Sequence, residues 1–145
     1  MNKELRIAFI GASGVGKSSF INALVGNNFS PDYYPTFGVT EYVYNDWINL
    51  FDFSGLEYTI YNIKKLKYKL TQLNINFIFF ICDCVNKISY KHIQYLKKEI
   101  NNIEYIILSN KFDLSRYAYD FGDDIYCKIS VKKNQAFDLK DILLN

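Results

Sequence analysis

The stretch Gly11–Ser18, GASGVGKS, most constrains the fold of this chain, because it fits the pattern G-x-x-x-x-G-K-[ST] at every fixed position. The mostly apolar residues 5–10 before it are typical of a buried strand, and residues 17–25 after it suit a helix. In this strand–loop–helix arrangement, the glycines allow the backbone to curl so that its amide groups point at an anion. The positive N-terminus of the helix then also faces that anion. We therefore expect a phosphate-binding loop rather than a glycine-rich surface turn.

Two side chains of this loop have the chemistry that a bound nucleotide needs. The charge of Lys17 can reach the β- and γ-phosphates, and the Ser18 hydroxyl can coordinate Mg²⁺. The nucleotide-binding residues expected here are Ser13, Gly14, Val15, Gly16, Lys17, Ser18 and Ser19.

Length and composition narrow the class of protein. The 145 residues predict a single domain, 1–145, and the hydrophobic half of the chain is enough for a conventional core. A net charge of +2 gives no reason to expect nucleic acid as a partner. Three cysteines without C-x-x-C spacing argue against a disulfide framework or a zinc site. No apolar run approaches a membrane span and no lipidation cysteine ends the chain, so we expect a cytoplasmic protein, peripheral to membranes only through partners.

Apolar and β-branched patterns alternate along the chain. Helical periods cover residues 17–25, Tyr58–Leu73, Ser89–Ile100 (with Ser89 as the cap) and Asn134–Leu144. Strands are expected at residues 5–10, Phe37–Tyr44, Trp47–Asp52, Ile75–Cys82, Tyr105–Leu108 and Ile125–Ile129, with a turn at Asn45-Asp46. This alternation predicts an α/β fold with a mostly parallel sheet, whose ligands bind at the carboxyl ends of the strands. The only histidine, His92, is expected at the surface of a helix.

Two short motifs follow predicted strands. Asp52 begins a D-x-x-G motif, in which the acid can hold Mg²⁺ through a water and the Gly55 N–H can reach a γ-phosphate. Asn110-Lys111-Phe112-Asp113 is an N-K-x-D motif. The Asp113 carboxylate can accept two hydrogen bonds from guanine that adenine cannot donate, and the Lys111 stem can lie along the ring. Together with the phosphate loop, this motif predicts a guanine nucleotide.

With these motifs the chain resembles a Ras-superfamily small GTPase, closest to Rab-type members, over nearly its full length. The resemblance implies a P-loop NTPase fold (a small G domain) with about six strands, one of them antiparallel from the Phe37–Asp52 hairpin, and helices on both faces. It implies GTP or GDP as ligand with Mg²⁺, and catalytic roles at Lys17, Thr36, Gly55 and the position of Leu56. By the same resemblance Thr36 joins Ser18 and Asp52 at the metal, and the further nucleotide contacts are Phe29, Tyr33, Ser130, Val131 and Lys132. Protein effectors and regulators would bind the loops Tyr33–Phe37 and Gly55–Ile63.

The departures from the family are specific. Leu56 stands where the family usually has the glutamine that orients the attacking water, so we expect slow hydrolysis. The hairpin is short, and residues 115–124 leave room for a loop where relatives have a helix.

Three functions follow from these patterns. The first is a guanine-nucleotide switch whose loops are ordered by the γ-phosphate. The second is a GTP-binding decoy or scaffold with negligible hydrolysis, favoured by Leu56. The third, another P-loop enzyme such as a nucleotide kinase, is disfavoured by the N-K-x-D motif and by the scarcity of arginine.

Overall fold

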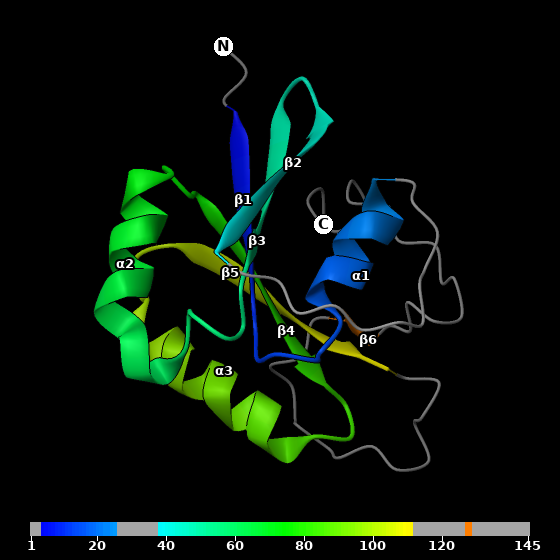
Figure 1. Cartoon of the computed structure of the whole chain (residues 1–145), viewed down its shortest axis with the longest axis vertical. Coiled ribbons are helices and arrows are strands. Elements are labelled where there is room, and N and C mark those ends of the chain that lie inside the picture. The colour runs from blue at the N-terminus through cyan, green and yellow to red at the C-terminus, as the bar shows by residue number, and fades with distance from the viewer. Residues whose placement is uncertain (1–3, 26–37, 112–126, 129–145) are drawn as a thin grey trace.

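The structure is a computed structural model that describes residues 4–25, 38–111 and 127–128. Strands and helices alternate along the described residues (Figure 1). The elements are β1 (Leu5–Ile10), α1 (Lys17–Leu24), β2 (Val39–Asn45), β3 (Ile48–Phe53), the 3-10 helix η1 (Ile60–Asn62), α2 (Ile63–Gln72), β4 (Phe77–Asp83), α3 (Lys87–Glu99), β5 (Glu104–Asn110) and β6 (Cys127–Lys128).

Within the described residues, the strands form one six-stranded sheet in the order β2-β3-β1-β4-β5-β6. Of these six described strands, only the β2–β3 pair is antiparallel, and the other neighbouring strands run parallel (Figure 1). After β1 the chain forms β2 and β3 on one side of β1, and it then crosses to form β4 on the other side of β1. This reversal beside β1 is the place where open α/β sheets bind ligands. The mostly parallel sheet with one antiparallel hairpin strand is thus confirmed.

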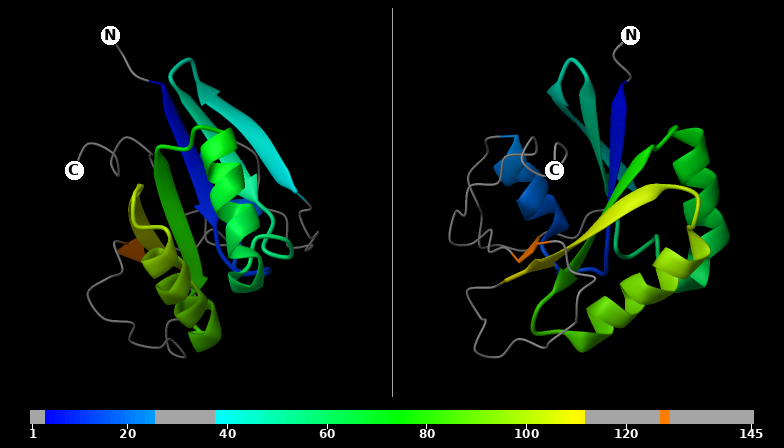
Figure 2. Two further views of the ribbon diagram at one scale, coloured as in Figure 1. Left: turned by 90° about the vertical axis from the view of Figure 1, so that its left-hand side faces the viewer. Right: turned by 180° about the vertical axis from the view of Figure 1, so that it is seen from behind.

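Helices cover both faces of the sheet, as predicted (Figure 2). Side chains alternate along β1, so Ile7 and Phe9 pack toward α1, where Phe20 is buried with them. Ala8 and Ile10 point to the other face, which is covered by α2 and α3. There the helices contribute Leu66, Leu70, Ile93, Leu96 and Ile100 to the core. They recur at the three- and four-residue spacing of one helix face, which is the period on which these helices were predicted.

The hairpin turn lies one residue later than predicted. Asn45 still pairs with Ile48, so the turn consists of Asp46 and Trp47 rather than Asn45-Asp46. The Asn45 Oδ1 atom accepts a hydrogen bond from the Trp47 N–H at 2.8 Å, which closes the turn locally. Trp47 is therefore exposed in the turn, and the prediction that it opens a strand was wrong.

Two helix starts also differ from the prediction. Regular α-helix in the second helical segment begins at Ile63 rather than at Tyr58, because Tyr58 is buried against Phe53 with the ring centroids 5.0 Å apart. In α3 the capping residue is Asn86, whose side chain accepts from the Ile88 and Ser89 N–H groups. Ser89 is instead buried in the first turn.

The remaining boundaries shift by a few residues. β4 begins at Phe77 and runs on to Asp83, and β5 extends the predicted strand to residues 104–110. β6 lies within the predicted strand Ile125–Ile129. The predicted helix Asn134–Leu144 and the loop at residues 115–124 lie outside the described residues.

His92 is not the simple surface residue that was predicted. Both of its ring nitrogens are shielded from solvent, and neither has a hydrogen-bond partner among the described residues. Burial lowers the pKa of the His92 imidazole, and the positive charge of Lys17 lowers it further. The folded protein therefore favours neutral His92.

The lowered pKa of His92 predicts that the stability of the protein depends on pH. Below about pH 6.5 the unfolded chain takes up a proton at His92, while the folded protein resists protonation. The free energy of unfolding should therefore be retained above that pH and fall as the pH decreases below about 6.5. Urea unfolding across this range should show the decrease, and the His92→Gln variant should flatten it. An equal slope in both proteins would contradict this account of His92.

Candidate functional site

The loop between β1 and α1 has the backbone shape that the sequence motif predicts. Gly16 has a φ of 95°, in the left-handed region, and a Cβ atom there would also collide with the side-chain amide of Asn110. Glycine is therefore required at this position for both conformation and space. Gly16 is also the N-cap of α1 and brings no side chain to the amide groups of the first helical turn. These amides can interact with an anion.

Lys17 lies inside this loop. It is 6% exposed, and its Nζ atom donates to the carbonyl oxygens of Gly11 at 3.0 Å and Ala12 at 3.3 Å. Burial lowers the pKa of Lys17, and the negative charge of Asp52 partly opposes that effect. A phosphate oxygen is a suitable further partner, because it would add a negative charge beside a largely desolvated ammonium group.

Asp52 and Ser18 meet beside Lys17. Asp52 is fully buried near the end of β3, paired in register with Phe9 of β1, and its Oδ2 accepts a hydrogen bond from the Ser18 hydroxyl. A hydroxyl and a carboxylate are hard oxygen donors that fit Mg²⁺, which takes few protein ligands and completes its shell with phosphate and water oxygens. The two described members of the predicted metal set are thus adjacent.

The turn after β3 lies against the phosphate loop. A Cβ atom at Gly55 would collide with the backbone of Ala12 and Ser13, so only glycine allows this approach. Leu56 follows and is 49% exposed, with its N–H donating to the Ser54 Oγ atom at 3.2 Å. The position expected to orient water is therefore occupied by an exposed apolar side chain.

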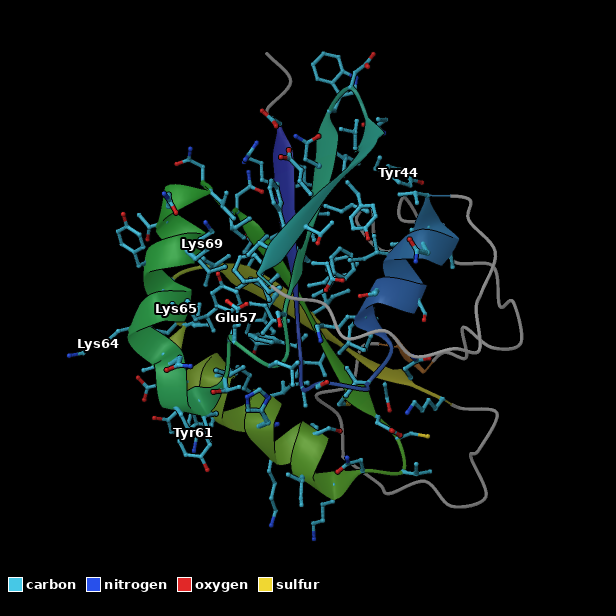
Figure 3. The ribbon with its side chains drawn as sticks, in the orientation of Figure 1. Tyr44, Glu57, Tyr61, Lys64, Lys65 and Lys69 are labelled. Atoms are coloured by element: carbon cyan, nitrogen blue, oxygen red, sulfur yellow. The ribbon has the colours of Figure 1, made fainter. Side chains whose placement is uncertain are left out.

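Glu57 ties this turn to two other segments. Its Oε1 accepts from the Gly38 N–H at 2.8 Å, and its Oε2 lies 3.1 Å from the Lys65 ammonium on α2 (Figure 3). Lys65 and then the Gly38 N–H lower the pKa of Glu57, because both stabilise the carboxylate. Gly38 also accepts a hydrogen bond from the Ser54 N–H at 2.9 Å. The residue that leads into β2 is thus held to the turn by two hydrogen bonds.

The described part of the N-K-x-D motif also reaches the phosphate loop. Asn110 donates from Nδ2 to the Val15 carbonyl at 3.0 Å, and Lys111 donates from Nζ to the Gly14 carbonyl at 2.9 Å. The Lys111 ammonium also lies 2.9 Å from the Asp83 carboxylate. These contacts therefore link the residues at the carboxyl ends of β1, β4 and β5.

Asp83 is the residue of this site that the sequence reasoning missed. Its only signal was an acid directly after the apolar run at residues 75–82. Of the predicted residues, the phosphate loop, Asp52, Gly55, Leu56, Asn110 and Lys111 are brought together, and Ser19 lies in α1 behind the loop. The remaining candidates lie outside the described residues: Phe29, Tyr33, Thr36, Asp113, Ser130, Val131 and Lys132.

Residues 6–111, well over half of the chain, match the model of a family described as 50S ribosome-binding GTPase. The chain belongs to this GTPase family. The GTPase has the P-loop NTPase fold that the sequence predicted, and its ligand is a guanine nucleotide, with GTP hydrolysis as the family's general reaction. No curated protein matched the chain. Among the described residues of this GTPase, no helix is both long and apolar enough to span a membrane.

Proposed function

We propose that this GTPase is a guanine-nucleotide switch of the small-GTPase type, similar to the Ras superfamily and within it to Rab-type proteins, with residues 1–145 forming one domain. The main support is the meeting of the phosphate loop, Asp52 and the Asn110-Lys111 pair at one sheet edge. In such a switch the γ-phosphate orders the loops around Thr36 and Gly55, and its loss releases them.

In this proposal Lys17 and the loop amides bind the phosphates, and the Gly55 N–H reaches the γ-phosphate. Ser18 and Thr36 would hold Mg²⁺ directly and Asp52 through a water; when bound, this ion neutralises charge that develops on the phosphate oxygens. Asp113 would read the guanine edge, and the further base and ribose contacts would come from Phe29, Tyr33, Ser130, Val131 and Lys132.

Hydrolysis is proposed to be slow. Leu56 has no group that can hydrogen-bond to a water, so the attacking water lacks the positioning that a glutamine gives it. The loop and Lys17 still stabilise charge, so some activity remains. An activating partner that relies on a glutamine would not accelerate the reaction.

A binding module with negligible hydrolysis, acting as a decoy or scaffold, is the second candidate. The exposure of Leu56 favours it, because an apolar side chain at 49% exposure suits contact with a partner as well as loss of catalysis. In either case, effectors and regulators are proposed to bind the loops Tyr33–Phe37 and Gly55–Ile63. Tyr61, in the second of these, is 88% exposed and is available for such contacts (Figure 3).

A substitution at Asp113, the residue proposed to read the base, tests the proposal. The Asp113→Asn variant should bind GTP about a hundredfold more weakly, because two charge-assisted hydrogen bonds to guanine are replaced or lost. Binding of ATP should change little. Calorimetric titration of both nucleotides measures the effect, with Asp46→Asn in the exposed hairpin turn as the matched control. Unchanged GTP affinity in the Asp113 variant would remove the role assigned to this carboxylate.

A further inference from the structure

We propose that Asp83 is a positioning residue of the nucleotide site, which holds Lys111 against the phosphate loop and thereby slows nucleotide release. This inference rests on the proposed function, because it takes Lys111 as one wall of the guanine pocket. Asp83 itself would touch neither base nor phosphate, and it would act through Lys111.

The carboxylate of Asp83 is fixed at both of its oxygens. The residue ends β4, and its side chain is only 9% exposed. Its Oδ2 lies 2.9 Å from the Lys111 ammonium, while its Oδ1 accepts from the Val85 N–H at 3.0 Å. An acid held in this way cannot easily turn toward solvent, so its charge stays directed at Lys111.

Lys111 is restrained at its backbone as well as at its ammonium. Its φ of 66° lies in the left-handed region, which a non-glycine residue rarely adopts. Next to it the Cys84 N–H donates to the Asn110 carbonyl at 3.0 Å, and the Cys84 thiol donates to the Lys111 carbonyl at 3.2 Å. The backbone is thus held in a conformation that brings the ammonium between Asp83 and the Gly14 carbonyl.

Charge explains why an acid belongs so close to an anion-binding loop. The Lys111 ammonium is neutralised by Asp83 and also donates to Gly14, so its charge is already compensated before phosphate arrives. Lys17 remains in the loop to bind the phosphates. The Lys111 stem can then serve as a fixed apolar surface for the base, and its ordering cost is met before binding. Without Asp83 the ammonium would lose its charged partner among the described residues, and the stem would become more mobile.

The rate of nucleotide release tests this role. The Asp83→Asn variant keeps the shape of the side chain and an oxygen for the Val85 N–H, but it removes the charge. Release of a ribose-labelled fluorescent GDP, chased with unlabelled GDP, should be about tenfold faster than in the wild type, which corresponds to about 1.4 kcal/mol. Asp46→Asn, in the exposed turn, should leave the rate unchanged.

A second variant separates positioning from a general structural effect. Lys111→Met keeps an apolar stem and removes the ammonium, so it too should speed release about tenfold. Because Asp83 acts through that ammonium, adding Asp83→Asn to Lys111→Met should have no further effect. An equal additional factor in both backgrounds would overturn the inference.

The possible failures are distinguishable. A wild-type protein that retains no guanine nucleotide would remove the proposed function itself. A wild-type protein that retains it, with Asp83→Asn releasing at the same rate, would overturn only the role of Asp83. If Asp83→Asn proves unfolded by circular dichroism, an unchanged release rate in Lys111→Met still overturns the inference, because Asp83 is proposed to act only through that ammonium.

Discussion

Replacing Lys17 by alanine should weaken GTP binding by at least about a hundredfold, because hydrogen bonds from a charged donor to phosphate contribute about 1.5–3 kcal/mol each. Lys17 is almost completely buried, and the contacts of its ammonium with the Gly11 and Ala12 carbonyls keep it at the loop. Alanine retains no cation, yet it is the residue most favourable to a helix, so α1 should still begin at this position.

Calorimetric titration with GTP and Mg²⁺ measures this loss, and thermal unfolding without nucleotide checks that the fold survives. Lys64→Ala on the exposed face of α2 is the matched control and should bind GTP as the wild type does (Figure 3). A Lys17→Ala protein that is folded and loses less than about fivefold in affinity would show that the loop does not hold phosphate through this lysine.

Replacing Leu56 by glutamine should raise the rate of single-turnover GTP hydrolysis by about tenfold or more, since placing a group that orients the reacting water typically contributes at least that much. The side chain at this position is half exposed, and the hydrogen bond to Ser54 comes from the backbone, so the substitution should not disturb the turn. The remaining parts of the site are unchanged in the variant.

Leu56→Met is the control for this experiment, because it keeps an apolar side chain of similar volume and should hydrolyse as slowly as the wild type. Rapid-quench measurement with one equivalent of GTP gives the rate constant directly. If the wild type already hydrolyses GTP as fast as the glutamine variant, another residue positions the water and the interpretation of Leu56 is wrong.

The parts of the fold that were predicted correctly are those with strong local signals. The segment from β1 through the phosphate loop to α1 agrees with the prediction almost residue for residue, because a motif and a hydrophobic period coincide there. Errors arose where two similar residues compete for one role. Asn86 and Ser89 can both cap a helix, and the cap was assigned to the wrong one of the two. The second helix was started too early for a different reason, because the packing of Tyr58 against Phe53 is a tertiary contact that the local pattern does not show.

The residues of the site likewise fall into those that the sequence predicted and those that it did not. Its loop, Asp52 and Asn110-Lys111 are recognisable because their spacing along the chain is distinctive. Asp83 is not, because its meaning depends on β4 and β5 lying side by side in a register that pairs it with Asn110. His92 was misjudged for a related reason, since its burial depends on what α3 packs against rather than on the pattern of α3 itself.

The central claim is that this chain has a nucleotide site specific for guanine. Calorimetric titration of the wild-type protein with GTP and with ATP, each with Mg²⁺, tests it most directly. A site that accepts hydrogen bonds from the guanine edge strongly rejects adenine, which lacks those donors. GTP should therefore bind at least about a hundredfold more tightly than ATP. Equal affinity for the two nucleotides, or no binding of GTP, would contradict the account.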